Sequence, residues 1–438
     1  MAYLVGVLVM VVGVLVSIGL HEVGHMVPAK RFGVRVSQYM VGFGPTLWST
    51  TRGETEYGLK AVPLGGYVRL VGMYPPGDPR RAAKKGRIAE LIQSARDASA
   101  DEIHPGEEHR AFYNLSAPKK LVVMLGGPVM NLVIAVVLMA AVVVGFGSLQ
   151  PTTTLETVAQ CVLPLDAPAD ATCEDSDVAA PAAAAGLRPG DTIVEFGGDD
   201  ITGWDQLAGL IAQTGGERSS IVVERDGQRV ESEITPVVTD RPTYDDEGEL
   251  QVDAAGEPVT EPAGFLGIGP TQELEGQSIA LVPGMVGERL SQTASVMLTL
   301  PQRLVDVAQA AFGDAERDEN SVIGVVGIGR FAGEITSSDV DGYGADLMAA
   351  DLLMMIAGLN IALFAFNLIP LLPLDGGHVV GALYEGARRQ VARARGRERP
   401  LPADTARMMP LAYGVFVVLA AMGVLLVYAD IVKPVRLM

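Results

Sequence analysis

The chain alternates long apolar runs with polar stretches, a pattern that predicts four membrane-spanning helices. The apolar runs hold no charged residue and extend over Met1–Leu20, Leu121–Leu155, Leu352–Leu374 and Met408–Ala429. Each provides the roughly 20 residues that an α-helix needs to cross a bilayer. Because the first run has no basic leader and no small-residue cleavage site, we interpret it as a retained helix and not as a signal peptide.

Shorter patterns predict β structure and a compact α/β module between the spans. Short apolar runs alternate with Gly and Pro over Val36–Leu70, which is typical of β-hairpins. The charged stretch Arg80–Arg110 indicates a helix or a disordered insert. Asp240–Pro262, rich in Asp, Glu, Gly and Pro, predicts a flexible loop. Within Pro181–Pro236 the pattern predicts three strands and a helix, at Thr192–Phe196, Ser220–Arg225, Arg229–Thr235 and Trp204–Gln213.

Composition and charge give this membrane protein an orientation. Hydrophobic residues make up 49% of the chain and the mean hydropathy is +0.29, which argues against a purely soluble protein. Val27–Lys120 has 15 basic against 9 acidic residues, and Val379–Pro410 has 7 against 3. Ser148–Ala350 has no lysine and 9 arginines against 36 acidic residues. Because basic loops stay cytoplasmic, we expect the acidic loop and both termini outside. The acidic domain also excludes nucleic acid as its partner.

These patterns divide the chain into eight segments. We expect transmembrane helix 1 (1–27), cytoplasmic-side β-hairpins with the charged insert (28–120), transmembrane helix 2 (121–147), an extracytoplasmic domain with an acidic loop (151–270), a membrane-proximal extracytoplasmic linker (271–350), transmembrane helix 3 (351–376), a basic cytoplasmic loop (377–407) and transmembrane helix 4 (408–430). Both cysteines, Cys161 and Cys173, fall in the external domain. An oxidising compartment permits them to form a disulfide, which we predict, and the alternative is two free thiols.

One motif carries chemistry at the end of the first span. His21-Glu22-Val23-Gly24-His25 has the pattern H-E-x-x-H. On a helix this spacing puts two imidazoles one turn apart on the same face with a carboxylate beside them, as two zinc ligands and a general base require. Three ionisable residues within five positions of an apolar helix are costly and indicate a function. The alternative is a solvated helix end in the interfacial region.

A catalytic zinc site takes a third protein ligand and leaves one position for water. The candidates are Asp375, His378, His104 and His109. Twenty helical residues put His21 about 30 Å from the outer face, near the cytoplasmic side. The third span brings Asp375 to the same depth, whereas His104 and His109 lie in the polar insert. Spacing therefore favours Asp375 and leaves His378 open.

Taken together, the motifs resemble the site-2 protease family of intramembrane zinc metalloproteases. Besides H-E-x-x-H, the third span carries Asn367-Leu-Ile-Pro370 and Leu374-Asp375-Gly376-Gly377. Ala185–Asp191 is similar to the A-G-L-x-x-G-D turn of bacterial PDZ domains, and the whole resembles actinobacterial members with one PDZ domain. The likeness covers nearly the whole chain and includes Gly42-Phe43-Gly44-Pro45, Pro63-x-Gly65-Gly66, Gly127-Pro128-x-x-Asn131 and Val325-x-Gly327-Ile328.

The resemblance implies a fold and a set of roles. The fold is a polytopic α-helical membrane protein with four transmembrane helices, membrane-associated β-hairpins and one extracytoplasmic α/β PDZ domain. Asp375 becomes the third zinc ligand and Glu22 the catalytic base. Asn367 is expected to hold the substrate backbone, although an amide that only packs helices is the alternative. The hairpin with Gly42 and Gly44 is expected to dip into the membrane beside the cleft and bind substrate.

One position departs from the family pattern. Many relatives have a second asparagine five positions before the one that matches Asn367, and here that position is Ala362. Asn360 lies on the same helical face and is our candidate to replace it in substrate binding.

The expected activity is hydrolysis of a peptide bond inside single-span membrane proteins, within the plasma membrane and near its cytoplasmic side. Family members cut anti-sigma factors after a first external cut, so we expect such pre-trimmed substrates in the lipid bilayer, with Zn²⁺ as the cofactor. The PDZ groove is expected to bind a peptide or to serve only as a size filter. Rival functions are a non-catalytic zinc-containing receptor that senses external peptides and an ion transporter. Intact Glu22 argues against the first, and the lack of polar groups in Met408–Ala429 argues against the second.

Overall fold

A computed structural model describes residues 1–77, 86–163, 172–173, 177–243, 251, 258–313, 317–318, 321–338, 343–398 and 400–435 of the chain. It divides into two compact units. We call Met1–Phe146 with Ser278–Met438 the membrane unit, and Gly147–Gln277 the inserted unit.

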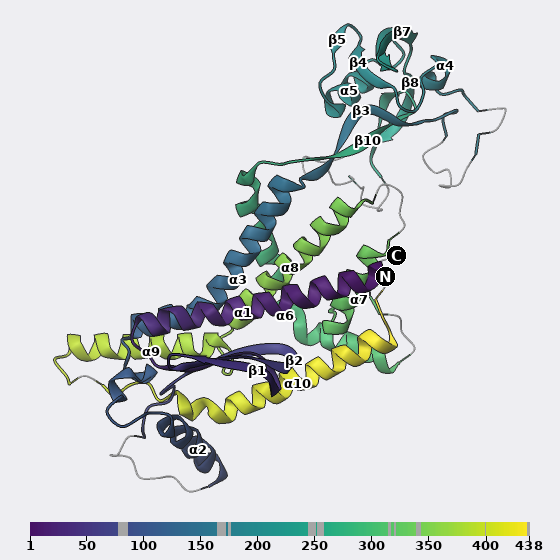
Figure 1. Ribbon diagram of the computed structural model, residues 1–438. Coiled ribbons are helices and arrows are strands. Elements are labelled where there is room, and N and C mark those ends of the chain that lie inside the picture. The colour runs from purple at the N-terminus through teal and green to yellow at the C-terminus, as the bar shows by residue number, and fades with distance from the viewer. Residues whose placement is uncertain are drawn as a thin grey trace. The chain divides into compact units, whose positions relative to one another are not determined.

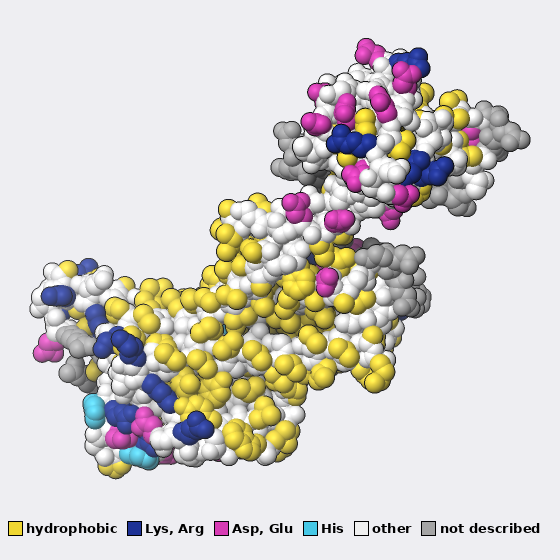
Figure 2. Space-filling view, turned by 45° about the horizontal axis from the view of Figure 1, so that its top comes forward, with side chains coloured by type: hydrophobic (Ala, Val, Ile, Leu, Met, Phe, Trp, Pro, Cys, Tyr) yellow, Lys and Arg dark blue, Asp and Glu magenta, His cyan; other side chains and the backbone are white. Residues whose placement is uncertain are grey.

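Four helices of the membrane unit are long and apolar enough to cross a bilayer, as predicted. They are α1 (Ala2–Arg31), α3 (Ala117–Gly145), α8 (Ala345–Asn367) and the segment Thr405–Val432, which ends in α10 (Met409–Val432). Apolar side chains cover these helices, while Lys, Arg and His side chains gather at the end of the unit that carries α2 and α9 (Figure 2). This distribution is typical of a multi-pass membrane protein.

The helix formed by the second apolar run ends before the apolar run itself does. α3 ends at Gly145, and a strand begins at Ser148. Gly147 between them has a positive φ of 80°, which ends the helix without the strain that a side chain would cause. The threonines that follow favour an extended strand because they are β-branched.

The membrane unit has further helices, and composition had not indicated two of them, α6 and α7. The further helices are α2 (Arg87–Asp101), α6 (Val282–Phe312), α7 (Val325–Thr336) and α9 (Asp375–Ala394), with the 3₁₀ turns η1 (Glu108–Arg110), η2 (Phe112–Asn114), η3 (Ile279–Leu281) and η4 (Thr405–Met408). The stretch expected as a linker thus contains α6 and α7. α6 packs Val282 and Val286 against α3 and α8, so the start of this helix is covered by other helices.

The third span also ends earlier than expected. α8 ends at Asn367, and α9 begins at Asp375, inside the stretch expected as transmembrane helix 3, and continues to Ala394 in the stretch expected as a loop. Pro370 and Pro373 lie between them. Proline cannot donate a backbone hydrogen bond and restricts the residue before it, so the helix breaks here. The break makes Asp375 the first residue of a new helix.

The predicted β structure is present as two long antiparallel strands, β1 (Val36–Arg52) and β2 (Thr55–Leu70), which lie beside α1 (Figure 1). Both strands bend, and Tyr39 faces Val68 on one side and Tyr57 on the other. Four segments therefore lie side by side in the order 46–52, 55–59, 36–43 and 62–70. Segment 62–70 has strand partners on one side only, among the described residues, and forms an edge of the sheet.

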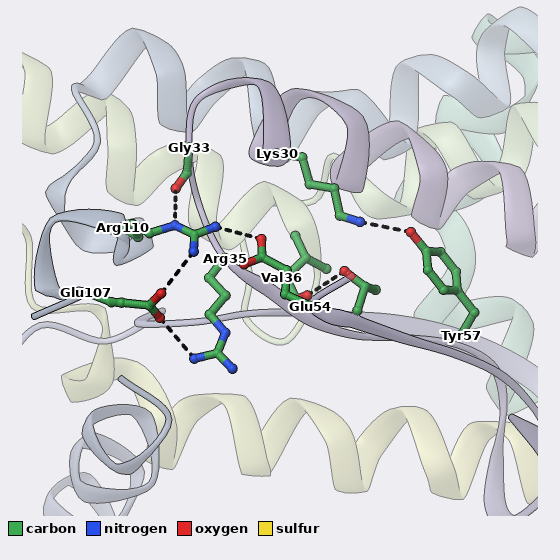
Figure 3. A network of polar contacts seen from close by, with 9 residues as sticks. Lys30, Gly33, Arg35, Val36, Glu54, Tyr57, Glu107 and Arg110 are labelled. Carbon is green, nitrogen blue, oxygen red and sulfur yellow. Dashed lines mark hydrogen bonds and ion pairs between the residues drawn. The ribbon is translucent and has the colours of Figure 1, made fainter. Parts of the chain in front are cut away.

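A polar network fixes this sheet to the carboxyl end of α1 (Figure 3). Arg110 donates to the Gly33 carbonyl over 3.3 Å and pairs with Glu54 at 2.6 Å, where the two strands meet. Lys30, in the last turn of α1, donates to the Tyr57 hydroxyl over 2.9 Å. Because these contacts join α1 to the sheet, they fix the position of one relative to the other.

α7 joins the first and last spans at the opposite end of the unit. The Tyr3 ring packs so closely on Gly333 that a Cβ there would come within 2.5 Å of it. Asp430 of α10 accepts the backbone N–H groups of Gly324 and Gly327 and pairs with buried Arg317. The amino end of α1 and the carboxyl end of α10 are thus held at the same end of the unit.

The inserted unit contains a six-stranded sheet with one long helix. Its strands are β3 (Ser148–Val158), β4 (Thr192–Phe196), β5 (Asp199–Asp200), β6 (Ser219–Arg225), β7 (Gln228–Ile234) and β10 (Ile268–Glu275), paired in the order β10-β3-β4-β6-β7 with β5 beside β4. The predicted strand at Thr192–Phe196 and helix at Trp204–Gln213 (α5) have the expected bounds. α4 (Pro181–Ala184) precedes them, and the core is built from Ile193, Phe196, Leu207 and Ile221.

Two further predictions concern the edges of this unit. A disulfide joins Cys161 to Cys173, so neither thiol is free. The stretch expected as a loop begins and ends in a strand pair, β8 (Val237–Pro242) with β9 (Thr260–Phe265). Its centre, 244–250 and 252–257, lies outside the described residues.

Acid is expected to destabilise the inserted unit through Asp191, which is 1% exposed and pairs with Arg225 through two contacts of 2.7 Å. Burial acts to raise the pKa of Asp191, but hydrogen bonds from Arg225 and from the Arg188 backbone outweigh burial, and the pKa lies below its ordinary value. The pair stabilises the fold fully above the unfolded pKa of about 3.9 and loses this effect as the pH falls through the lower folded pKa. The unfolding temperature, followed by Trp204 fluorescence in a Trp48→Phe background, should therefore fall below about pH 4.

The same measurement on two variants isolates the pair. Arg225→Leu should lower the unfolding temperature at neutral pH and flatten its acid dependence. Arg218→Leu is the matched control, because its pair with Glu233 is solvent-exposed and should contribute little. An unchanged acid dependence in Arg225→Leu would contradict the role given to this pair.

Candidate metal centre

The two histidines of the H-E-x-x-H motif lie on the face of α1 that packs against α3. The helices touch through backbone, since a Cβ on Gly24 would come 2.2 Å from the Gly126 carbonyl oxygen and one on Gly126 would come 2.0 Å from that of Gly24. Small residues permit such a close approach in membrane helices. Glu22 is 9% exposed and His25 is 5% exposed. The approach thus buries His25 between the two spans.

Asp375 completes a cluster of three potential ligands with His21 and His25. The two Nε2 atoms lie 3.2 Å apart, and Asp375 Oδ2 lies 3.4 Å from His21 Nε2 and 3.3 Å from His25 Nε2. Asp375 belongs to the first turn of α9, where the helix dipole favours a carboxylate. Among the described residues, this is the cluster of histidine, cysteine or carboxylate groups close enough to share an ion.

The cluster fits a zinc ion by its own distances. Two ligand atoms about 2.0–2.1 Å from a tetrahedral ion lie about 3.3 Å apart, which is the spacing of all three pairs here. Asp375 Oδ2 is buried and accepts no hydrogen bond from the described residues. His25 Nδ1–H donates to the Val123 carbonyl over 2.8 Å, which leaves the Nε2 lone pair directed at the other ligands.

Gly127 of α3 provides the space for the cluster. A Cβ at this position would lie 2.2 Å from His25 Nε2 and 2.7 Å from His21 Nε2. Any side chain would therefore collide with the ligand atoms. In the sequence, Gly127 was only part of the motif Gly127-Pro128-x-x-Asn131, which did not indicate that this glycine touches the histidines.

Glu22 lies between α1 and the edge of the sheet. A Cβ on Gly66 would come 3.2 Å from Glu22 Cγ and 2.9 Å from Ile18 Cγ2, so segment 62–70 passes directly beside the carboxylate. An extended peptide paired with that edge would run past both Glu22 and the ligand cluster. A carboxylate beside metal ligands can serve as a general base in hydrolysis, and a free strand edge can bind an extended peptide.

The other candidates for the third ligand lie apart from the cluster. His378 is half-buried on α9 and does not join it, and burial lowers the pKa of this imidazole to about 4, so it is neutral at pH 7. His104 and His109 are exposed, as the sequence indicated for residues of the polar insert.

The predicted substrate-binding residues take different positions. Asn367 is half-exposed and is the last residue of α8, directly before the break that leads to Asp375. Asn360 is fully buried and donates to Ser17 Oγ and to the Ile356 carbonyl, contacts that favour helix packing over substrate binding. Gly42 and Gly44 have positive φ angles inside the sheet, where β1 bends. The edge beside Glu22 instead contains Gly65 and Gly66.

Comparisons with known proteins agree with this geometry. The model of peptidase family M50 matches residues 9–410. Zinc metalloprotease Rip1 of Mycobacterium tuberculosis is 34% identical over 100% of both chains, and Rip1 of Mycolicibacterium smegmatis is 33% identical over 99% of each. Metalloprotease MmpA of Caulobacter vibrioides is 28% identical over 89% of this chain and 90% of its own.

Four apolar spans and a buried histidine–carboxylate cluster beside a glutamate define a class, the membrane-embedded metallopeptidases. The family match covers most of the chain and the mycobacterial similarity covers all of it. The chain belongs to peptidase family M50.

Proposed function

We propose that the protein is a zinc-dependent intramembrane endopeptidase of the site-2 protease type. The observation that carries the proposal is the convergence of His21, His25 and Asp375 at tetrahedral ligand spacing, beside Glu22 and with both histidines on a membrane span. A structural zinc site needs no carboxylate beside it and usually has four protein ligands. Among the described residues this cluster offers three, which leaves a position for water.

Each group has a defined role in peptide hydrolysis. Zinc held by His21, His25 and Asp375 supplies a Lewis acid that polarises the scissile carbonyl and its attacking water. Glu22 takes a proton from that water as its oxygen adds to the carbonyl carbon. When the C–N bond breaks, Glu22 passes the proton to the leaving amide nitrogen.

The substrate is a single-span membrane segment held in an extended form. A helical substrate must unwind, because its carbonyls are hydrogen-bonded and shielded. Segment 62–70 can hold the unwound peptide by strand addition, and the half-exposed amide of Asn367 can bond its backbone. Pre-trimmed anti-sigma factors are the proposed substrates, because the family resemblance implies them.

The charge pattern supports an orientation in the plasma membrane. The end with α2 and α9 carries the basic side chains (Figure 2), and the start of α1 and the end of α10 lie at the opposite end of the unit (Figure 1). Because basic ends stay cytoplasmic, the end with α2 and α9 lies at the cytoplasmic side and both termini lie outside. The centre, on the later turns of α1, is then near the cytoplasmic face. The inserted unit is extracytoplasmic, and we assign it as a PDZ domain on its turn motif and strand order.

Excising Gly147–Gln277 tests whether the inserted unit filters substrates by size. If it does, the protein without this unit should also cut substrates that have not been trimmed.

The test uses the full chain in liposomes with a single-span substrate. Cleavage should stop with a zinc chelator and return when Zn²⁺ is restored after chelator removal. A substrate truncated on its external side should be cut without a partner protease. Cleavage that persists after the metal has been removed would overturn the proposal, and no cleavage in any metal state would favour the receptor function.

A further inference from the structure

Three buried polar side chains lie one helical turn from the metal centre, each on a different span. We call Ser17 of α1, Asn131 of α3 and Asn360 of α8 the polar layer. They are 2%, 0% and 0% exposed, respectively. Buried polar groups of this kind normally have hydrogen-bond partners, since leaving them unpaired is costly.

The contacts along α1 place the three residues at one level. α3 runs antiparallel to α1, because Gly24 meets Gly126 and His21 meets Gly127. One turn farther on each helix are Ser17 and Asn131, on the same faces as His21 and Gly127. By this register the two residues lie at one level, just beyond the ligand histidines.

α8 closes the third side of the layer. A Cβ on Gly13 of α1 would touch Ile356, and Asn360 donates to Ser17 Oγ over 2.9 Å, so α8 runs parallel to α1 here. Ala357 and Ile361, on either side of Asn360, pack in one cluster with Ala135 of α3. Asn360 thus lies where α8 meets both other helices, and Asn131 is one turn from Ala135.

Three polar atoms of the layer have no partner among the described residues. They are both side-chain atoms of Asn131 and Oδ1 of Asn360. Turning the Asn131 amide over, so that its oxygen and nitrogen exchange places, does not supply a partner, because neither atom is hydrogen-bonded. The remaining partner must be a small group that both donates and accepts hydrogen bonds. A substrate backbone is excluded from a layer so fully buried, whereas water makes two to four such bonds in protein interiors.

We propose that Ser17, Asn131 and Asn360 form a binding site for water, which serves as the reserve for hydrolysis at the metal centre. The reserve role rests on the proposed function, but the water site does not. One turn of α1 is about 5.4 Å, a distance that two successive water hydrogen bonds span. Each hydrolysis adds one water across the peptide bond, its oxygen to the carbonyl carbon and its hydrogens to the two products. The layer can replace that water while a peptide occupies the edge beside Glu22.

Radiolytic hydroxyl labelling tests the water site without any need for activity. A short X-ray pulse converts bound water to hydroxyl radicals, which oxidise adjacent side chains that mass spectrometry then identifies. In the full chain in lipid, Ile361, which is fully buried, and Leu132, which is partly buried, should both be labelled because they lie next to the layer. Ile193, as buried as Ile361 but in an apolar core, is the internal reference and should stay unlabelled.

Asn131→Leu should reduce the labelling of Leu132 and Ile361 by about fivefold, because an apolar side chain of similar size removes two of the partners that hold water. Met139→Leu is the matched control, since Met139 is 1% exposed two turns along α3. It should leave the labelling unchanged. Ser17→Ala adds no bulk and should give a smaller reduction of about twofold. All three variants should retain their zinc.

The turnover rate separates the two parts of the proposal. Asn131→Leu should lower kcat about five- to tenfold, the equivalent of one lost hydrogen bond, with KM unchanged. Wild-type labelling equal to that of Ile193, or equal labelling in wild type and Asn131→Leu, would overturn the water site. Lost labelling with unchanged kcat would overturn the reserve role. A wild type that is labelled but never cleaves a substrate would instead contradict the proposed function.

Discussion

Glu22→Gln is expected to abolish proteolysis while leaving the metal and the fold in place. Glutamine has the shape of glutamate but cannot take a proton from water, so kcat should fall by about 10²- to 10⁴-fold, as expected for loss of a general base. Glu22 does not belong to the ligand cluster, so zinc per chain should stay at the wild-type value. The measurements are cleavage of a reconstituted single-span substrate and metal content by mass spectrometry.

Glu334→Gln is a matched control for this substitution. Glu334 also lies on a helix of the membrane unit, where it pairs with Arg330 one turn away and both side chains are partly exposed. Its loss should leave cleavage within about twofold of wild type, because ion pairs one turn apart on a helix contribute little. Residual activity of Glu22→Gln within tenfold of wild type would rule out the role of catalytic base.

The second large effect should come from one added methyl group. In Gly127→Ala the new Cβ would lie 2.2 Å from His25 Nε2, which is closer than two atoms in contact can approach. It would also lie 2.7 Å from the imidazole of His21. Either α3 moves away from α1 or the imidazoles rotate, and both changes disrupt the ligand spacing. Zinc affinity should fall by at least about 10- to 100-fold, as it does when the groups that orient metal ligands are lost, and proteolysis should fall with it.

A helical glycine without neighbours provides the comparison. Gly414 of α10 has open space where a Cβ would be, so Gly414→Ala should leave zinc binding and cleavage intact. Zinc titration of both variants in lipid, with helix content followed by circular dichroism, distinguishes a lost site from a lost fold. Wild-type zinc affinity in Gly127→Ala would show that the ligand cluster has more room than its contacts indicate.

The features that could be predicted from the sequence are those set by local patterns. Uninterrupted apolar runs indicate spans, and the alternation in Thr192–Phe196 and the amphipathic period of Trp204–Gln213 fix a strand and a helix to the residue. H-E-x-x-H indicates two metal ligands because helical geometry alone places His21 and His25 on one face. These inferences need no knowledge of what packs against what.

The features that escaped prediction depend on contacts between distant segments. α6 has a mixed composition and becomes recognisable as a helix of the membrane unit only when Val282 and Val286 pack against other spans. The break after Asn367 lies inside an apolar run, so hydropathy alone does not reveal it. The contact of Gly127 with the histidines depends on how α3 is rotated and how closely it approaches α1. Neither is encoded in the spacing of residues along one helix.

The inserted unit enters and leaves the chain through neighbouring strands, because Ser148 of β3 lies opposite Glu275 of β10. Partners in an antiparallel pair are about 5 Å apart, so the gap left in the chain could be closed by a single tight turn. Insertions with adjacent ends are the ones that evolution and protein engineers exchange most readily. This position is thus a natural graft point, where a different sensor or binding module could replace the present one while the catalytic spans keep their own connectivity.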